Sequence, residues 1–461
     1  MNAAEPIPPY RLDRKSAPTL KDRMDGFYLV LLGGLVLLLM GTALETTPGA
    51  MGDFKALYYP TRCLLTHHDP YNSEAVLGTL RAESGMQQDY SQGDLLMVPH
   101  FNYLPTTLPF ISLFAWLPFH SARIAWMLTS STILIVGGFL IWDLASCYAP
   151  SLSGAMVGFL LGNSELIAVN GNVAGICAGL CATAVWCFAN TRLEMIGVIS
   201  LALALGIKPH LAGFVWLYFL LSTAYRKRAL QTLAVLAAFG VLSYLWVSSV
   251  SPRWIGEWRT TMQIYSTHGS FNDQGPTGAN ENHPSLIINL QTAIALFDDD
   301  PKVYDLVTWL IVRALFALWI AATRKAKSSS RFEFVGLAAA ASLTLLPVYH
   351  RECDAKLLLL TVPACALLWS EAGRRGRIAV ALAATGLFVT ADIPWAIDIW
   401  LLGHLQRPGN GFRGRLLVAS QVLPVPLALL GEAIFFLWIY ARSARPGTSE
   451  AEIAMRPATT L

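Results

Sequence analysis

Long apolar stretches recur along most of the chain, and this feature restricts its fold more than any other. The runs at 26–44, 229–250, 306–322 and 378–389 reach or approach the roughly 20 apolar residues that a helix needs to cross about 30 Å of hydrocarbon. Of the 461 residues, 54% are hydrophobic and only 14% are charged, against roughly 25% in ordinary soluble domains. Because the runs recur as far as Tyr440, a single signal peptide or anchor is excluded, and the sequence predicts an all-α polytopic membrane protein.

Charge and cysteine usage exclude two other classes of site. The 33 basic and 30 acidic residues nearly balance, with a formal net charge of +3, and this gives no case for a nucleic-acid partner. The seven cysteines are scattered, mostly within apolar runs, with no CxxC and no metal-like Cys/His spacing. We therefore interpret them as small buried hydrophobic residues rather than metal ligands, and we expect no cofactor.

The positive-inside rule orders the chain across the membrane. The basic segment 1–25 stays cytoplasmic, the first crossing is at about 26–44, and a long mixed segment at about 45–123 forms the first outer loop. Within that loop, 104–119 is apolar but short and carries three prolines, so it is either a crossing or a helix lying at the interface. If it does not cross, nearly all later basic clusters fall in the cytoplasm, and we adopt that threading.

The threading gives about twelve transmembrane helices within one membrane domain, 26–440, followed by a polar cytoplasmic tail, 441–461, that we expect to be disordered. The spans after the first are expected at about 124–142, 153–168, 173–190, 195–208, 210–224, 229–250, 304–323, 332–348, 355–371, 376–396 and 418–440.

Charged residues at the ends of several predicted spans share the outer face in this threading. Charges at membrane depth are expensive and invite a functional interpretation. Asp53 follows the first span, Lys208 lies between two apolar stretches, and His350 and Arg351 follow the ninth span. One carboxylate together with several cations suits an anionic lipid-linked ligand, and a phosphate is the obvious candidate.

Each of these residues also has an ordinary structural explanation. Asp53 is a candidate general base or the N-cap of a following helix. Lys208 either holds a phosphate or extends to the interface. The segment from His350 to Asp354 is either a phosphate site or a solvated loop, and Asp69, with the Pro and Tyr that follow it, indicates a turn.

Several motifs follow one another along about residues 26–371. They are an acidic-aromatic opening, Gly52-Asp53-Phe54, with a later Asp69-Pro70-Tyr71; the proline-rich aromatic segment 103–119; Gly162-Asn163; Lys208-Pro209; and the late His350. In this order they resemble glycosyltransferase family 87, a membrane branch of the GT-C superfamily that includes polyprenyl-phosphate-mannose-dependent mannosyltransferases. Two departures are the Gly-Asn pair, where the family usually has Gly-Gln, and the charged run that follows His350.

The resemblance implies a GT-C-like fold and transfer of a hexose, with mannose the expected sugar, from a polyprenyl-phosphate donor to a lipid or glycan acceptor. It implies that Asp53 is the base and that His350 lies near the donor phosphate, and we expect Lys208 and Arg351 to contact the same phosphate. Tyr58, Tyr59 and Asn163 are expected to contact donor or acceptor, and metal is not required.

The expected location is the inner (plasma) membrane, with the site facing the periplasm or cell exterior and membrane lipids around it. The competing hypotheses are a transporter or flippase of lipid-linked sugars, and a non-catalytic scaffold.

Overall fold

The computed structural model is all-helical in the part of the chain that it describes, apart from one isolated β-bridge between Ile287 and Arg351. It describes residues 18–44, 47, 49–84, 91–191, 193–270, 272–275, 287–326, 330–404 and 412–443. The predicted tail, 441–461, and the first cytoplasmic segment, 1–25, fall largely outside these residues.

Seven helical segments within the described residues are long and apolar enough to cross a membrane, and this confirms a polytopic membrane protein. Two of them consist of two consecutive helices. They are α1 (Leu20–Leu44), α6 (Phe119–Ser146), α7 (Pro150–Leu161) with α8 (Glu165–Asn170), α12 (Arg226–Val250), α15 (Pro301–Lys325), the 3-10 helix η5 (Glu352–Thr361) with α17 (Val362–Ser370), and α21 (Pro424–Ser443).

Shorter helices complete the bundle and its connections. The apolar ones are η3 (Pro105–Thr107) with α5 (Leu108–Ala115), α9 (Ala174–Ala189), α10 (Glu194–Ile207), α11 (Pro209–Leu221) and α16 (Ser330–Thr344). The others are α2 (Gly52–Leu65), α3 (Ser73–Ser84), α4 (Gln92–Met97), α13 (Trp254–Ser266), α14 (Leu290–Ala295), α18 (Arg374–Val389), α19 (Asp392–His404) and α20 (Phe412–Val422).

The predicted spans correspond to these helices, with boundaries shifted by a few residues. The ambiguous segment 104–119 folds as η3 and α5, which together are shorter than a membrane crossing requires. This agrees with the threading in which the segment stays on one side. Because only seven segments reach full spanning length, the total of about twelve crossings stays a prediction.

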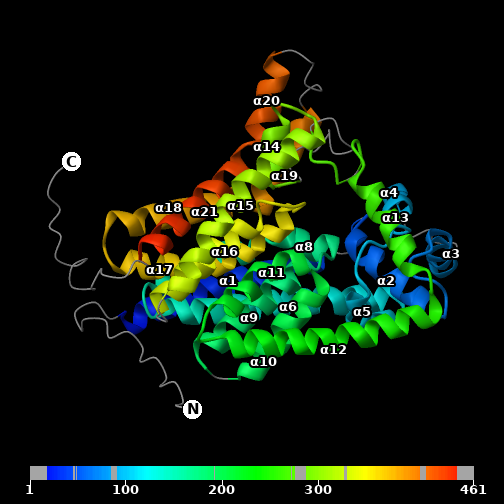
Figure 1. Cartoon of the computed structure of the whole chain (residues 1–461), viewed down its shortest axis with the longest axis horizontal. Helices are drawn as coiled ribbons and strands as arrows, with labels where there is room; N and C mark the ends of the chain where they lie inside the picture. Colours follow the sequence, from blue (N-terminus) through cyan, green and yellow to red (C-terminus); the bar gives the residue numbers. More distant parts are fainter. Residues whose placement is uncertain are drawn as a thin grey trace.

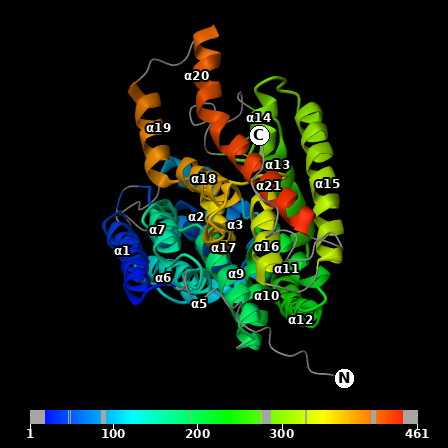
Figure 2. The same ribbon diagram turned by 90° about the vertical axis from the view of Figure 1, so that its left-hand side faces the viewer.

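The long helices leave apolar faces uncovered at the surface of the bundle. In α12 only 11% of the most apolar window is buried, and Leu242 and Leu245 are 66% and 58% exposed. The η5–α17 segment lies at the centre instead, with 89% of its window buried. Figure 2 shows α1, α6 and α7 on one side and α12 and α15 on the other. Exposed apolar faces of this length suit contact with lipid.

Close backbone approach between α1 and α7 depends on glycine. A Cβ atom on Gly33 would collide with the backbone of Gly158, and one on Gly154 would collide with the backbone of Gly26. Small residues at such contacts are how membrane helices pack tightly without a hydrophobic driving force. The contact fixes the position of α1, and therefore of the segment that follows it.

The bundle has two chemically different ends. We call one the basic end: it carries Arg23, Arg228, Arg375 and Arg442, and Arg23 donates to Ser146 at the end of α6 (3.0 Å). We call the other the polar end: it carries the starts of α2, α9 and α11 and the segment between α16 and η5. Figure 1 shows α2, α3, α4 and α13 gathered at one end of the molecule.

Candidate active site

Asp53 lies in the first turn of α2, where it is not the helix cap. The N-cap is Met51, in a left-handed conformation, and no side chain caps the helix. The Asp53 carboxylate instead accepts a hydrogen bond from the Asn172 side-chain amide (2.7 Å). Asn172 is itself fixed, because its Oδ1 accepts from the backbone of Ala174 (2.8 Å). The capping explanation of Asp53 is therefore wrong, and its carboxylate is held by a residue 119 positions away.

The turn between α8 and α9 positions this contact. Gly171 has φ +69°, and a Cβ there would approach the Cβ of Phe54 to 2.5 Å, so only glycine fits. Its carbonyl accepts from the indole of Trp126 (2.9 Å), and the Met51 amide donates to the carbonyl of Val169 (2.6 Å). These bonds hold the beginning of α2 against the turn that carries Asn172.

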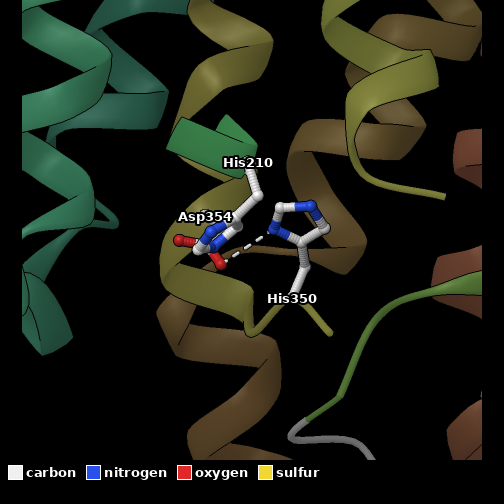
Figure 3. Close-up of side chains that lie close together, drawn as sticks. All are labelled: His210, His350 and Asp354. Atoms are coloured by element: carbon white, nitrogen blue, oxygen red, sulfur yellow. Dashed lines mark hydrogen bonds and ion pairs between the residues drawn. The ribbon is translucent and has the colours of Figure 1, made fainter. Parts of the chain in front are cut away.

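A second cluster is organised around Asp354 in η5. Lys208, between α10 and α11, forms a buried ion pair with it. His350 Nδ1 lies 3.0 Å from the other carboxylate oxygen, and the Arg351 backbone amide donates to that oxygen (3.3 Å). Since an ionised carboxylate only accepts, Nδ1 carries the proton. Figure 3 shows this pair with His210, whose ring centroid lies 5.2 Å from that of His350.

The remaining nitrogen of His350 is available for a ligand. The side chain is fully buried, and its Nε2 has no hydrogen-bond partner among the described residues. Buried polar atoms are normally paired, so an orphan here indicates a place where another molecule binds. With Nδ1 fixed by Asp354, Nε2 can accept a proton or, once protonated, donate to an anion.

Electrostatic interactions of Arg351 and Tyr103 extend to the carboxylate of Asp53. Burial alone lowers the pKa of the Arg351 guanidinium, but nearby Tyr349, Asp53 and Glu352 raise it above its usual value. Burial raises the pKa of Tyr103, and the carboxylates of Asp53 and Asp354 both add to the rise. Each of these residues is thus within electrostatic range of Asp53, and Tyr103 is within range of both carboxylates.

Backbone hydrogen bonds hold the segment that carries His350 and Arg351. Ile288 donates to the carbonyl of His350 (3.0 Å), and Leu290 donates to the carbonyl of Leu346 (3.1 Å). The Ile287–Arg351 bridge adds to them. The chain around the start of α14 therefore holds the segment from His350 to Asp354 in place. One explanation of this segment was a solvated loop, but both His350 and Asp354 are buried.

The other predicted contacts lie elsewhere. Tyr58 and Tyr59 are buried in an aromatic cluster with Phe119, and the Tyr58 hydroxyl donates to the carbonyl of Leu117 (2.8 Å). The Asn163 carbonyl accepts from Lys356 (2.6 Å), which is also paired with Asp392 (3.0 Å). The contacts of all three with donor or acceptor stay predictions.

Several residues of this site were not among the predicted site residues. Asp354 is only four residues after His350, but His350 lies before the 3-10 helix η5, so no regular helical spacing indicated their pairing. Asn172 and Tyr103 carry no local signal either, because the hydrogen bond of Asn172 to Asp53 and the electrostatic interaction of Tyr103 with Asp53 depend on how distant segments pack.

His210, His350 and Asp354 also form a group spaced to hold a metal ion, with ligand atoms within 4.8 Å of one another. Both carboxylate oxygens of Asp354 already have hydrogen-bond partners. Lys208 donates to one oxygen, and His350 and the backbone amide of Arg351 donate to the other. An ammonium so close would oppose a divalent cation, so the arrangement suits an anion better than a metal.

All seven cysteines are free, and six of them are buried as predicted, whereas Cys147 is exposed. Asp69 accepts from the backbone of Tyr71 (2.9 Å), which confirms the predicted turn.

Comparison with known families decides the identity of the chain. The model of glycosyltransferase family 87 matches residues 101–348, more than half of the sequence. The chain belongs to glycosyltransferase family 87. The matched region of this family 87 protein includes Lys208 and Asn172, whereas Asp53, His350 and Arg351 lie outside it. No curated protein and no solved structure matched the chain.

Proposed function

We propose that this protein moves a hexose, with mannose the first to test, from a polyprenyl-phosphate donor to a hydroxyl of a lipid or glycan acceptor. Membership of family 87 supports a membrane glycosyltransferase. The observation that carries the finer proposal is the arrangement of Asp53, held by Asn172, within electrostatic range of Arg351. A base and a phosphate site at one end of a lipid-facing bundle are what such a reaction needs.

In the proposed reaction, the Asp53 carboxylate takes the proton of the acceptor hydroxyl as its oxygen attacks the anomeric carbon. A new carbon–oxygen bond forms while the bond from the anomeric carbon to the phosphate oxygen breaks. The polyprenyl phosphate leaves with the electron pair. A single displacement of this kind inverts the configuration of the anomeric carbon.

Arg351 and His350 are the proposed contacts of the leaving phosphate, and Lys208 contributes its charge next to Asp354. Cations aimed at the developing charge stabilise the transition state, and in a site closed to water they act strongly. No metal ion is needed in this proposal, because side-chain cations supply the positive charge.

The proposed orientation puts the polar end outside. The basic end carries four arginines: Arg23, Arg228, Arg375 and Arg442. By the positive-inside rule, we therefore assign that end to the cytoplasm. The polar end then faces the periplasm or cell exterior in the inner (plasma) membrane. Cysteine labelling with a membrane-impermeant maleimide at Thr267→Cys and Lys227→Cys, exposed sites at the two ends, tests this.

The test of the reaction uses the purified protein in vesicles with synthetic polyprenyl-phosphate [14C]mannose and extracted membrane lipids. Radiolabel in a new lipid or glycan product supports transfer. Label that only crosses the membrane, still attached to its polyprenyl phosphate, would contradict transfer and favour the transporter. A parallel series with glucose and galactose donors identifies the sugar.

A further inference from the structure

A buried ion pair joins Lys356 in η5 to Asp392 at the start of α19 (3.0 Å), and the two side chains are only 4% and 7% exposed. The Lys356 ammonium also donates to the carbonyl of Asn163 (2.6 Å) and to that of Thr390 (3.5 Å). A lysine has three donors, and each of them here is directed to a neighbouring segment. The pair therefore connects η5 with the turn between α7 and α8 and with the turn between α18 and α19.

Asp392 does for α8 what a capping side chain normally does. A cap accepts from the second or third amide of its helix. The N-cap residue Ser164 makes no such bond, and its hydroxyl donates instead to the carbonyl of Leu160 (2.6 Å). The second carboxylate oxygen of Asp392 accepts from the amide of Leu166, the second residue of α8 (2.6 Å). The beginning of α8 is thus held by a residue 226 positions away.

The other end of α8 contacts the segment that carries the proposed base. The helix has six residues and is therefore about 9 Å long. Near its end the carbonyl of Val169 accepts from the amide of Met51 (2.6 Å), and just beyond it Asn172 donates to the carboxylate of Asp53 (2.7 Å). The backbone amide of Asn172 donates to the carbonyl of Ile167 within the helix (3.1 Å). A shift at the beginning of so short a helix therefore also moves Asn172.

The same ion pair is also close to the proposed phosphate contacts. Lys356 is two residues after Asp354 in η5, about 4 Å along a 3-10 helix. Asp354 in turn orients the imidazole of His350 through Nδ1 (3.0 Å). Transfer by displacement requires the acceptor hydroxyl and the leaving phosphate to be aligned on opposite sides of the anomeric carbon, and misalignment by about 1 Å can cost a hundredfold in rate.

We propose that Lys356 and Asp392 are positioning residues, whose ion pair fixes the beginning of α8 against η5 and thereby sets the place of Asp53 relative to His350. They act through α8 and η5, without contact with the sugar or the phosphate. The effect on transfer rests on the proposed function, whereas the mechanical link from Asp392 to the start of α2 does not.

Hydrogen exchange tests the mechanical link without catalysis. Asp392→Ala removes both carboxylate oxygens, and exchange is measured over residues 49–54, which include the Met51 amide, in the full-length protein in nanodiscs. Phe188→Ala is the control for a general loss of stability, because Phe188 is buried against Phe219 (4.8 Å between ring centroids) at the far end of α9.

We expect exchange over residues 49–54 to be about fivefold faster or more in Asp392→Ala, because α8 no longer has a fixed beginning, and unchanged in Phe188→Ala. Unchanged exchange in Asp392→Ala would overturn the proposal. Equal acceleration in both variants would also overturn it, because the effect would then be a general loss of stability. Asp392→Asn is the second variant, since it keeps an oxygen for the Leu166 amide while losing the charge, and we expect it to show a smaller acceleration.

Transfer kinetics test the effect on the reaction. In Asp392→Ala the maximal rate should fall about tenfold to a hundredfold, with the KM for the donor nearly unchanged. Because Asp392 acts on Asp53 through Asn172, the double variant with Asn172→Ala should be slower than Asn172→Ala alone by less than about twofold, whereas independent effects would multiply. Multiplied effects, or a raised donor KM with a normal maximal rate, would contradict the positioning role.

The two measurements separate this proposal from the proposed function. If the unsubstituted protein transfers no sugar from any donor, the proposed function fails, and the exchange over residues 49–54 still decides the mechanical link. If Asp392→Ala loses transfer without faster exchange there, the positioning role fails and the proposed function stands.

Discussion

The two ends of the helical bundle carry similar charged residues in opposite settings. At the basic end, Arg375 and Arg442 are exposed, and both lie over the ring of Trp438, at 5.7 and 4.4 Å from its centroid. At the polar end, Lys208 and Lys356 are buried and each pairs with an aspartate. Exposed arginines at a membrane surface tolerate many arrangements, whereas buried cations must be held in one. The difference supports the proposal that the reaction takes place at the polar end.

The largest effect on stability is expected from Lys208→Met. It leaves the buried carboxylate of Asp354 without its lysine, and breaking a buried pair on one side costs about 3–5 kcal/mol. We expect a large fall in melting temperature, measured by fluorescence-detected size-exclusion chromatography after heating. The exposed Lys227→Met at the basic end is the control and should melt normally. A variant of Lys208 that melts like the unsubstituted protein would contradict the buried pairing.

A second prediction concerns Asn172, which holds the Asp53 carboxylate. Asn172→Ala removes a hydrogen bond to a charged group, a contact worth about 1.5–3 kcal/mol, so the rate of transfer should fall roughly tenfold or more. The KM for the donor should change little, because the phosphate contacts remain. Asn190→Ala, which alters an amide at the basic end, is the matched control. A raised donor KM with normal kcat would place Asn172 in donor binding instead.

The polar end should also respond to pH through Glu257 in α13. Burial, together with a hydrogen bond to Asp69 and that residue's charge, raises the pKa of Glu257 from 4.5 to about 7. The protonated carboxyl is favoured in the folded protein, so its contribution to stability is complete below about pH 4.5 and is lost as pH rises through 7.

Asp69 also accepts a hydrogen bond from the Ser251 side chain at the end of α12. The contact between Glu257 and Asp69 therefore ties α13 to the segment after α2. Hydrogen exchange in α13 should be a few-fold faster at pH 8 than at pH 5.5, after correction for intrinsic rates. Glu257→Gln should remove that difference. Exchange that stays pH-dependent in the glutamine variant would assign the effect to another group.

The smallest effect is expected at the basic end. Arg442→Ala removes an exposed contact with Trp438, and surface substitutions usually change stability by no more than about 0.5 kcal/mol. We expect normal transfer and a nearly normal melting temperature. Loss of transfer in the well-folded variant would mean that the basic end takes part in the reaction, and the comparison between the ends would fail.

Much of the fold could be predicted from the sequence, because hydropathy is a local property. The apolar runs located the long helices, and the short apolar length of 104–119 matches the short helices η3 and α5, while its placement on one side of the membrane stays a prediction. Helix α8 and the 3-10 helix η5 were not foreseen. They are short irregular pieces within spans, and their form depends on packing against neighbours.

The candidate site was predictable only in part. Charges at the ends of apolar runs are unusual, and this identified four candidate residues: Asp53, Lys208, His350 and Arg351. Their pairings were not predicted, because the contact between Asp53 and Asn172, for example, joins residues 119 positions apart. The fully buried Glu432 of α21 also lies within a predicted span and was not singled out.

The central claim is that sugar transfer takes place at the polar end, with Asp53 as the base. The most direct measurement compares single-turnover transfer of mannose by Asp53→Asn and by Asp25→Asn, an exposed carboxylate at the opposite end of α1. Donor binding and melting temperature are measured on the same samples. We predict that Asp53→Asn binds donor and melts normally but loses transfer by about a thousandfold, in the middle of the range for general acid–base catalysis, while Asp25→Asn is unaffected. Near-normal transfer by Asp53→Asn would contradict the account.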